Sequence, residues 1–167
     1  LYKLADIFKP EKITPATMEF LDIAGLVKGA NHGEGLGNQF LSHIRDVDAV
    51  IHVVRLFEDE NVSHVEGSLD PIRDIEIVET ELLLRDIASV DKRMEKLIKT
   101  ARIGEKESKI DLTVMEIILP KMNDGIMVHD IKLEKDQHRR IHQKALLTAK
   151  PTLYVANVDE DKILAEN

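Results

Sequence analysis

Three short segments of this 167-residue chain place acidic or amide side chains directly after apolar runs. Asp22 closes the run TMEFLDI and leads into Gly25, an acidic loop covers residues 57–70, and residues 157–160 (NVDE) follow the run TLYVA. Open parallel sheets bind ligands beyond the carboxyl ends of their strands. An aspartate in such a place can hold a magnesium-bound water, and a glycine three positions later lets its amide approach a terminal phosphate. Taken alone, this four-residue pattern is only a weak indication of a nucleotide-phosphate site.

Glycine is concentrated immediately after Asp22. Five of the eight glycines of the chain lie within residues 25–37, namely Gly25, Gly29, Gly33, Gly35 and Gly37. A core element would not tolerate so many, because each glycine loses much backbone entropy when it is ordered. The stretch is typical of a loop that is mobile or lies close against a ligand.

Hydrophobic periodicity predicts the elements that position these loops. We expect strands at residues 17–23, 49–56 and 152–156, the second of them rich in β-branched side chains. A short helix is expected at 37–45. A longer helix should begin at Asp70 and Pro71, which supply an acidic cap and a proline at the first helical position.

The same periodicity predicts a helical hairpin after residue 71. Apolar residues step by three and four through Leu83, Ile87, Val90, Met94, Leu97 and Ala101. Gly104 should end this helix, and a second one over 110–121 should be kinked or ended by Pro120. A further helix is expected at 133–147.

The order of these elements predicts an α/β fold with a parallel sheet that a helical insertion interrupts. The predicted domains are residues 1–78, the insertion 79–146, and residues 147–167, which return to the sheet.

Composition excludes several classes of protein. Hydrophobic residues make up 43% and charged residues 32% of the chain, as in globular domains. No apolar run reaches the roughly 20 residues of a membrane span, so we expect no membrane association. A net charge of −8 argues against broad, nonspecific coating of nucleic acid, and we expect no DNA partner. The absence of cysteine excludes a disulfide scaffold and fits a cytoplasmic location.

The longer string around the first two segments carries a family resemblance. The signatures GLVKGA, GEGLGN and HVEG-x-x-DP-x-x-DIE, with KPTLYVANVDE near the end, resemble the Obg-like ATPases, known in bacteria as YchF. This resemblance covers essentially the whole chain. It implies part of a Ras-like P-loop NTPase domain with a coiled-coil-like helical insertion, and a ribosome-associated protein that hydrolyses ATP with Mg²⁺.

The resemblance implies roles for individual residues. Asp22 and Gly25 correspond to Walker B and the start of switch II, with Asp22 holding Mg²⁺ through water. Leu26 stands where Ras-like proteins carry a glutamine, and a hydrophobic side chain cannot orient water. The family points instead to His64, since a histidine can orient or deprotonate water near neutral pH. The alternative is that His64 merely caps its loop.

The resemblance also bears on the choice of base. Ordinary GTPases carry NKxD where this chain reads NVDE, so Val158 and Glu160 replace the stacking lysine and the guanine-reading aspartate, after the shared Asn157. Loss of that bidentate contact removes about 1–3 kcal/mol of discrimination for guanine. The family implication is a preference for ATP over GTP. Without the other motifs, NVDE would be simply a turn.

No G-x-x-x-x-G-K-[ST] occurs in the sequence. If the resemblance holds, the P-loop lies upstream of Leu1 and a TGS-type domain lies downstream of Asn167, and this segment alone should not hydrolyse ATP.

Basic residues gather at residues 92–109, after an acidic run at 58–81. They can be a solvated helix face, or the hairpin tip can contact ribosomal RNA through Lys96, Lys99 and Arg102. Three hypotheses remain: an ATP-hydrolysing switch, a GTPase with relaxed base specificity, and a non-enzymatic helical binding module.

Overall fold

The computed structural model describes residues 2–22, 44, 46–59 and 68–163. The elements run α1 (Tyr2–Phe8), β1 (Val50–Arg55), α3 (Pro71–Arg102), α4 (Lys106–Asn123), η1 (Val128–Asp130), α5 (Lys135–His142), η2 (Leu147–Ala149), β2 (Thr152–Asn157) and α6 (Glu160–Ile163). The expected short helix at 37–45 lies almost entirely outside the described residues. No described helix combines the length and the apolar character that crossing a bilayer requires.

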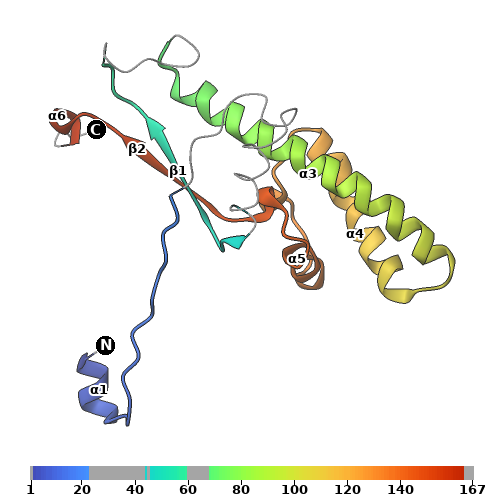
Figure 1. Ribbon diagram of the computed structural model, residues 1–167, viewed down its shortest axis with the longest axis horizontal. Helices are drawn as coiled ribbons and strands as arrows, with labels where there is room; N and C mark the ends of the chain where they lie inside the picture. The colour runs from blue at the N-terminus through green and yellow to red at the C-terminus, as the bar shows by residue number, and fades with distance from the viewer. Residues whose placement is uncertain (1, 23–43, 45, 60–67, 164–167) are drawn as a thin grey trace.

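The two described strands form a parallel sheet, as predicted. β1 pairs with β2 in a register that joins Val50 to Thr152 and Arg55 to Asn157. The chain between the two strands contains the helical hairpin, so the crossover is long, as parallel strands require. The fold is therefore a mixed α/β arrangement with two parallel strands and long helices (Figure 1).

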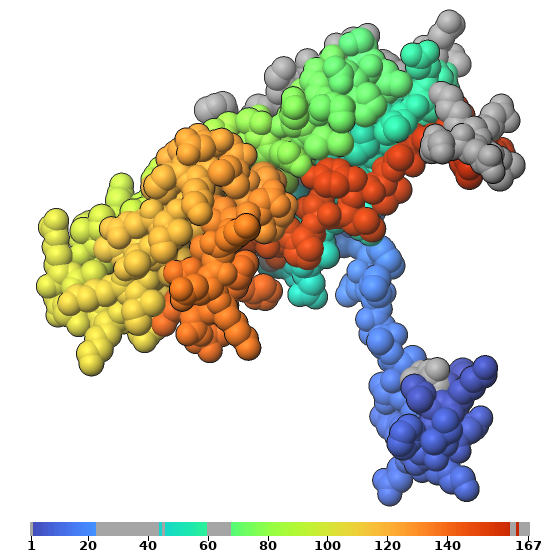
Figure 2. All heavy atoms as spheres, turned by 180° about the vertical axis from the view of Figure 1, so that it is seen from behind, coloured from blue at the N-terminus to red at the C-terminus, as the bar shows by residue number. Residues whose placement is uncertain are grey.

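The strand expected at residues 17–23 is absent over its described part. Residues 17–22 are exposed and belong to no helix or strand. An extended run becomes a strand when a neighbouring strand satisfies its N–H and C=O groups. No backbone hydrogen bond joins this run to the described strands. Together with α1 it stands clear of the rest of the molecule (Figures 1 and 2).

The helix α3 begins as the sequence predicts. Asp70 is extended (φ −147°), and its side chain accepts a hydrogen bond from the backbone N–H of Arg73 at 3.1 Å. Pro71 occupies the first helical position, where its missing N–H has no cost. The helix then runs for 32 residues without a break, across the predicted domain boundary at 78/79. The domain division stays a prediction.

Glycines with positive φ end both helices of the hairpin. Gly104 (φ +95°) follows α3 and Gly125 (φ +86°) follows α4. In each case the next residue donates a backbone hydrogen bond to the carbonyl five positions back, Glu105 to Thr100 and Ile126 to Lys121. This is the left-handed helix stop that favours glycine. The hairpin prediction and the stop at Gly104 are confirmed.

Pro120 was predicted to kink or to end the second helix, and the predicted end is wrong. α4 continues through Pro120 to Asn123, because a proline near the end of a helix removes one hydrogen bond and the last turn can still close. The amide of Asp124 donates to the Pro120 carbonyl at 3.1 Å.

The helix expected at 133–147 is also shorter than predicted, and α5 ends at His142. Ala145 takes a left-handed conformation (φ 51°), and η2 follows it. The amides of Leu147 and Thr148 are not available to a longer α5, because a side chain of α3 accepts hydrogen bonds from both.

The main core lies between α3 and α4 and extends under α5. The predicted seam faces it: Leu83 and Val90 are buried, and Ile87, Met94 and Leu97 pack against the cluster. The other side of the core comes from α4 and the segments after it, whose most buried side chains are Val114, Met115, Ile118, Met122, Val128, Ile141 and Leu146. A smaller cluster of Ile44, Leu82 and Leu147 joins α3 to the segment before β2.

Candidate functional site

Two of the three predicted loops leave the same edge of the sheet. Arg55 and Asn157 are paired residues at the carboxyl ends of β1 and β2. One residue further on, the Leu56 amide donates a hydrogen bond of 2.8 Å to the Asn157 carbonyl. The acidic loop after β1 and the NVDE segment after β2 therefore begin side by side. A single ligand at this edge can contact both.

Arg55 shapes the start of the loop after β1. Its Nε donates to the Phe57 carbonyl at 2.9 Å, and its guanidinium reaches the Asp59 carbonyl at 3.4 Å. The guanidinium also lies 4.6 Å from the centre of the Phe57 ring, within the range of a cation–π contact. Sequence analysis missed this residue, although a lone arginine at the end of an apolar strand was a visible signal.

The NVDE segment lies partly open to solvent. Asn157 is the last residue of β2 and is exposed, Val158 is half-buried, and Glu160 is exposed and starts α6. The short turn between strand and helix keeps Asn157 and Glu160 within three residues of each other at the sheet edge. This is the place that a base-recognition segment would need.

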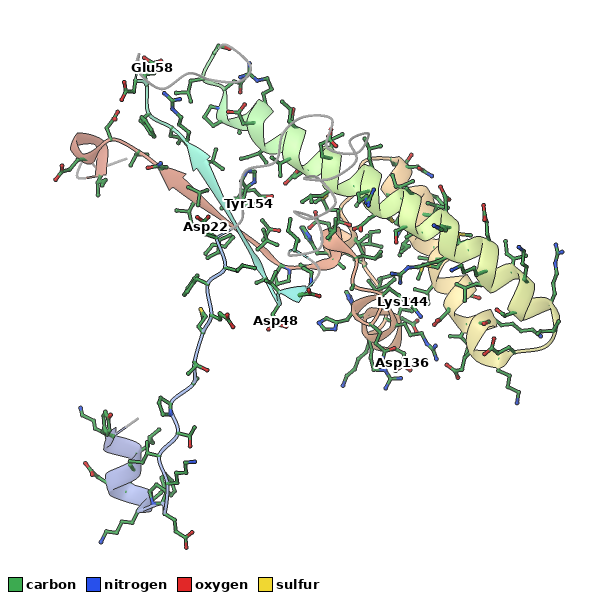
Figure 3. All side chains as sticks on the ribbon, in the orientation of Figure 1. Asp22, Asp48, Glu58, Asp136, Lys144 and Tyr154 are labelled. Carbon is green, nitrogen blue, oxygen red and sulfur yellow. The ribbon has the colours of Figure 1, made fainter. Side chains whose placement is uncertain are left out.

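Asp22 is the last described residue before a gap, and it is exposed. In the view of Figure 3 it projects onto the middle of the two strands near Tyr154, whereas Glu58 lies beyond the carboxyl end of β1. Among the described residues, no hydrogen bond or ion pair joins Asp22 to the NVDE segment. The other predicted site residues, namely Gly25, Leu26, Gly29, Gly33, Gly35, Gly37 and His64, lie outside the described residues.

A polar cluster ties α3 to one face of the sheet. His52 and Tyr154 are paired across β1 and β2, with ring centroids 5.6 Å apart, and the Tyr154 hydroxyl donates to the Glu79 carboxylate. Burial, and after it the hydrogen bond to Glu79, raises the pKa of Tyr154 to about 12. Burial lowers the pKa of His52 despite the nearby charges of Glu79 and Asp74. This direction favours the neutral form of the His52 ring, which lies against Tyr154.

A magnesium site at Asp22 would need few protein ligands. Mg²⁺ usually keeps several waters and binds one or two carboxylates together with substrate phosphates. Within the described ranges, no group of three metal-ligating side chains comes together. A single exposed carboxylate such as Asp22 fits an ion that the nucleotide itself would bring.

The tip of the hairpin presents the predicted basic residues to solvent. Lys96, Lys99 and Arg102 are all exposed on the last turns of α3. Their spacing of three residues places them within an arc of about 120° and along about 9 Å of the helix. They form one cationic stripe, which we call the tip stripe.

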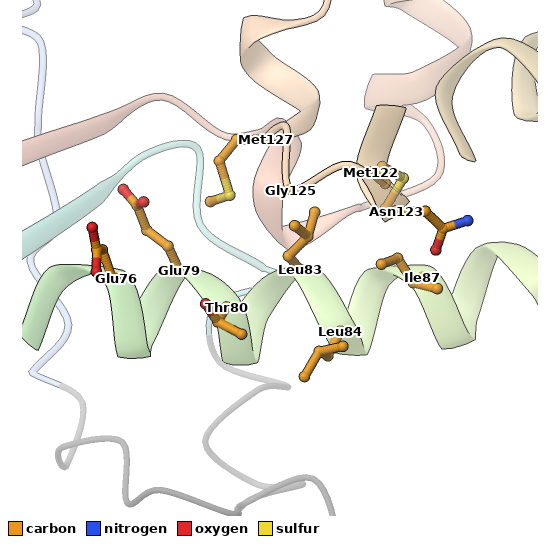
Figure 4. Close-up of a pocket in the computed structure, with 10 residues that line it drawn as sticks. All are labelled: Glu76, Glu79, Thr80, Leu83, Leu84, Ile87, Met122, Asn123, Gly125 and Met127. Carbon is orange, nitrogen blue, oxygen red and sulfur yellow. The ribbon is translucent and has the colours of Figure 1, made fainter. Parts of the chain in front are cut away.

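A groove of about 380 Å³ lies at the opposite end of the hairpin, between α3 and the end of α4 (Figure 4). Leu83, Ile87 and Met122 form its apolar floor, and Glu76 and Glu79 lie toward one end. Of the predicted nucleotide-site residues that the structure describes, none lines this groove. It is separate from the carboxyl edge of the sheet.

Comparisons with known proteins agree with the resemblance seen in the sequence. The family model described as 50S ribosome-binding GTPase matches residues 6–81. A protein named ribosome-binding ATPase YchF from Haemophilus influenzae is 51% identical over 95% of this chain and 44% of its own length. Proteins of the same name from Escherichia coli O157:H7 and Bacillus subtilis are 47% and 44% identical.

A solved structure of a YchF protein is also similar to this chain. The structure titled as the Schizosaccharomyces pombe YchF GTPase matches with a TM-score of 0.75 and 38% identity, over 98% of this chain and 45% of that one. The chain spans about 44% of the length of the curated relatives that it matches.

Proposed function

Because this chain belongs to the YchF family of Obg-like proteins, we propose that it forms part of a nucleotide-dependent switch that binds and hydrolyses ATP and associates with the ribosome. The observation that carries the proposal is the shared carboxyl edge of β1 and β2, where Arg55 pairs with Asn157. The chain spans less than half of the length of these relatives, and its sequence contains no Walker A motif.

Each predicted residue has a role in the proposed hydrolysis. Asp22 would hold the magnesium ion through water, and the Gly25 amide would donate to the γ-phosphate. His64 would orient the water for in-line attack on the γ-phosphorus, because Leu26 has no polar atom to do so. Bound Mg²⁺ would supply charge neutralisation at the phosphates.

The glycines at positions 29, 33, 35 and 37 would allow the loop after Asp22 to close on the γ-phosphate. Hydrolysis would release that loop, as in other phosphate-sensing switches. The change in the loop would alter the affinity of the protein for the ribosome.

Base preference rests on the segment after β2. Val158 would contact adenine mainly through its backbone, and Glu160 lacks the geometry that reads guanine in NKxD proteins. The names of the relatives leave two candidates, since the curated proteins are called ATPases, whereas the matching family model and the yeast structure are called GTPases. A GTPase with relaxed base specificity is therefore the second candidate function.

Competition binding separates these candidates. A fluorescent ATP analogue bound to the full-length protein with Mg²⁺ should be displaced by ATP at a lower concentration than by GTP. Equal displacement by both would favour relaxed specificity. Absence of any nucleotide binding, with ribosome association intact, would refute the switch and favour a non-enzymatic helical binding module.

We also propose that the tip stripe contacts ribosomal RNA. Its three cations are exposed, close together and far from the sheet edge, so they can bind phosphates without obstructing a nucleotide. The alternative is that these residues only solvate the helix.

A further inference from the structure

One buried carboxylate links the helical hairpin to the segment that enters β2. Asp86 of α3 is 2% exposed. Its Oδ1 accepts the Leu147 amide at 3.1 Å, and its Oδ2 accepts the Thr148 amide at 2.8 Å and the Thr148 hydroxyl at 2.7 Å. Leu147 and Thr148 begin η2, so a side chain 61 positions earlier in the sequence satisfies the free amides of that turn.

Thr148 is held from its other side as well. Its carbonyl lies 2.9 Å from Nδ1 of His129 in η1, and the residue is 1% exposed. Leu147 is buried in the small apolar cluster with Leu82 and Ile44. The amide, hydroxyl and carbonyl of Thr148 are therefore all engaged by two elements of the insertion.

A short covalent path leads from this contact to the nucleotide edge. Thr152, at the start of β2, lies four positions after Thr148, and β2 ends at Asn157. In the other direction α3 continues from Asp86 without a break to the tip stripe. Between Asp86 and the tip stripe, Arg93 of α3 donates a hydrogen bond to the Lys144 carbonyl at 2.7 Å. This contact fixes the chain between α5 and η2. A tilt of the hairpin must move β2, or break the hydrogen bonds to Asp86.

We propose that Asp86 is the positioning residue that couples the position of the hairpin to the position of the nucleotide-recognition segment after β2. This inference rests on the proposed function and adds the route by which ribosome contact and nucleotide affinity are coupled. Coupling of this kind is reciprocal: if ATP changes the affinity for the ribosome, the ribosome changes the affinity for ATP by the same factor.

The chemistry of the contact explains why a carboxylate is needed. Its two oxygens accept three hydrogen bonds in a space with almost no water. An asparagine has one acceptor oxygen, and its NH₂ group would face a donor. Asp86→Asn therefore keeps the size of the side chain but loses at least one of the three hydrogen bonds.

The test measures the dissociation constant of ATP from the full-length protein with and without saturating ribosomes. For the wild type we expect the two values to differ by about 5-fold or more, the usual lower range of a coupling between sites. Asp86→Asn should bring this ratio close to one. Asp111→Asn serves as the matched control, because it removes the same charge from the hairpin but breaks contacts with Arg140 of α5 and with Lys144, and leaves the hydrogen bonds to Asp86 in place. Its ratio should stay at the wild-type value.

If Asp86→Asn does not fold, a milder pair of variants at Thr148 still tests the proposal. Thr148→Val removes only the hydroxyl that donates to Asp86, and Thr148→Ser keeps it. Thr148→Val should lower the ratio and Thr148→Ser should not. Hydrogen exchange gives a second readout, since the amides of β2 should exchange faster in Thr148→Val than in Thr148→Ser.

The results distinguish this inference from the proposed function. If the wild type binds neither ATP nor ribosomes, the proposed function fails. The proposed function stands if the wild type shows coupling. The role of Asp86 is then refuted if Asp86→Asn and Thr148→Val keep the wild-type coupling, or if they reduce it no more than Asp111→Asn does.

Discussion

Neutralising the tip stripe should flatten the salt dependence of ribosome binding. The perturbation is the triple variant Lys96→Gln, Lys99→Gln and Arg102→Gln in the full-length protein. Glutamine has a helix propensity similar to that of lysine and arginine, so α3 should be preserved. All three residues are exposed, and none of them lies in the hairpin core.

The magnitude follows from the number of cations. Each contact between a cation and a nucleic-acid phosphate contributes about 0.7–0.9 to the slope of log affinity against log salt. Three contacts therefore contribute about 2–3, so that between 50 and 200 mM salt the wild type should lose roughly 20–40-fold more affinity than the variant. Sedimentation with purified ribosomes across a potassium chloride series, at constant Mg²⁺, measures both slopes.

A control variant separates local contact from overall charge. Lys132, Lys135 and Arg139 are also exposed and lie near or on α5, away from the tip. Their replacement by glutamine changes the net charge by the same three units and should leave the slope at the wild-type value. Equal slopes for wild type and tip variant, or equal flattening in both variants, would refute the reasoning.

Three other predictions concern the base, the hairpin and the backbone. Glu160→Asp combined with Val158→Lys in the full-length protein should raise the affinity for GTP relative to ATP by about 5- to 100-fold in competition binding, and an unchanged ratio would contradict the role of this segment. Asp111→Asn should cost about 1–2 kcal/mol of unfolding free energy at pH 7, because it breaks two charge-assisted hydrogen bonds in a half-buried site. Burial raises the pKa of Asp111, but hydrogen bonds from its two basic partners outweigh this and leave it lowered. Its stabilisation is thus complete above the unfolded-state pKa and lost as pH falls through the folded value. Urea unfolding followed by far-UV circular dichroism should show the difference shrinking toward pH 3, and a constant difference would contradict it. Ala145→Gly should stabilise the chain by up to about 1 kcal/mol in the same assay, because glycine relieves a φ of 51°, and a loss of stability would oppose this view.

Local signals in the sequence were sufficient to predict the helical hairpin and the parallel strands. Asp70 and Pro71 marked the start of α3, and Gly104 marked its end, because capping and positive φ depend on neighbouring residues alone. The run at 49–56 became β1, since β-branched residues favour a strand in almost any sheet. The shared edge of β1 and β2 then followed from their parallel order.

Local sequence patterns could not predict contacts between residues that are distant in the sequence. Nothing near residue 147 shows that Asp86 would accept its amide, so the early end of α5 was not predicted. The run at 17–22 has the pattern of a strand, but a strand also requires a partner, and the pattern cannot supply one. The contacts of Arg55 were missed because they are made with backbone carbonyls of the loop that follows it.

The most direct test of the central claim is a structure of the full-length protein with Mg²⁺ and a non-hydrolysable ATP analogue. The account predicts one nucleotide at the carboxyl edge of β1 and β2, with its base beside Asn157 and Val158 and its metal ion reached by Asp22 through water. A nucleotide bound elsewhere, or at this edge with Asp22 far from its phosphates, would contradict the account.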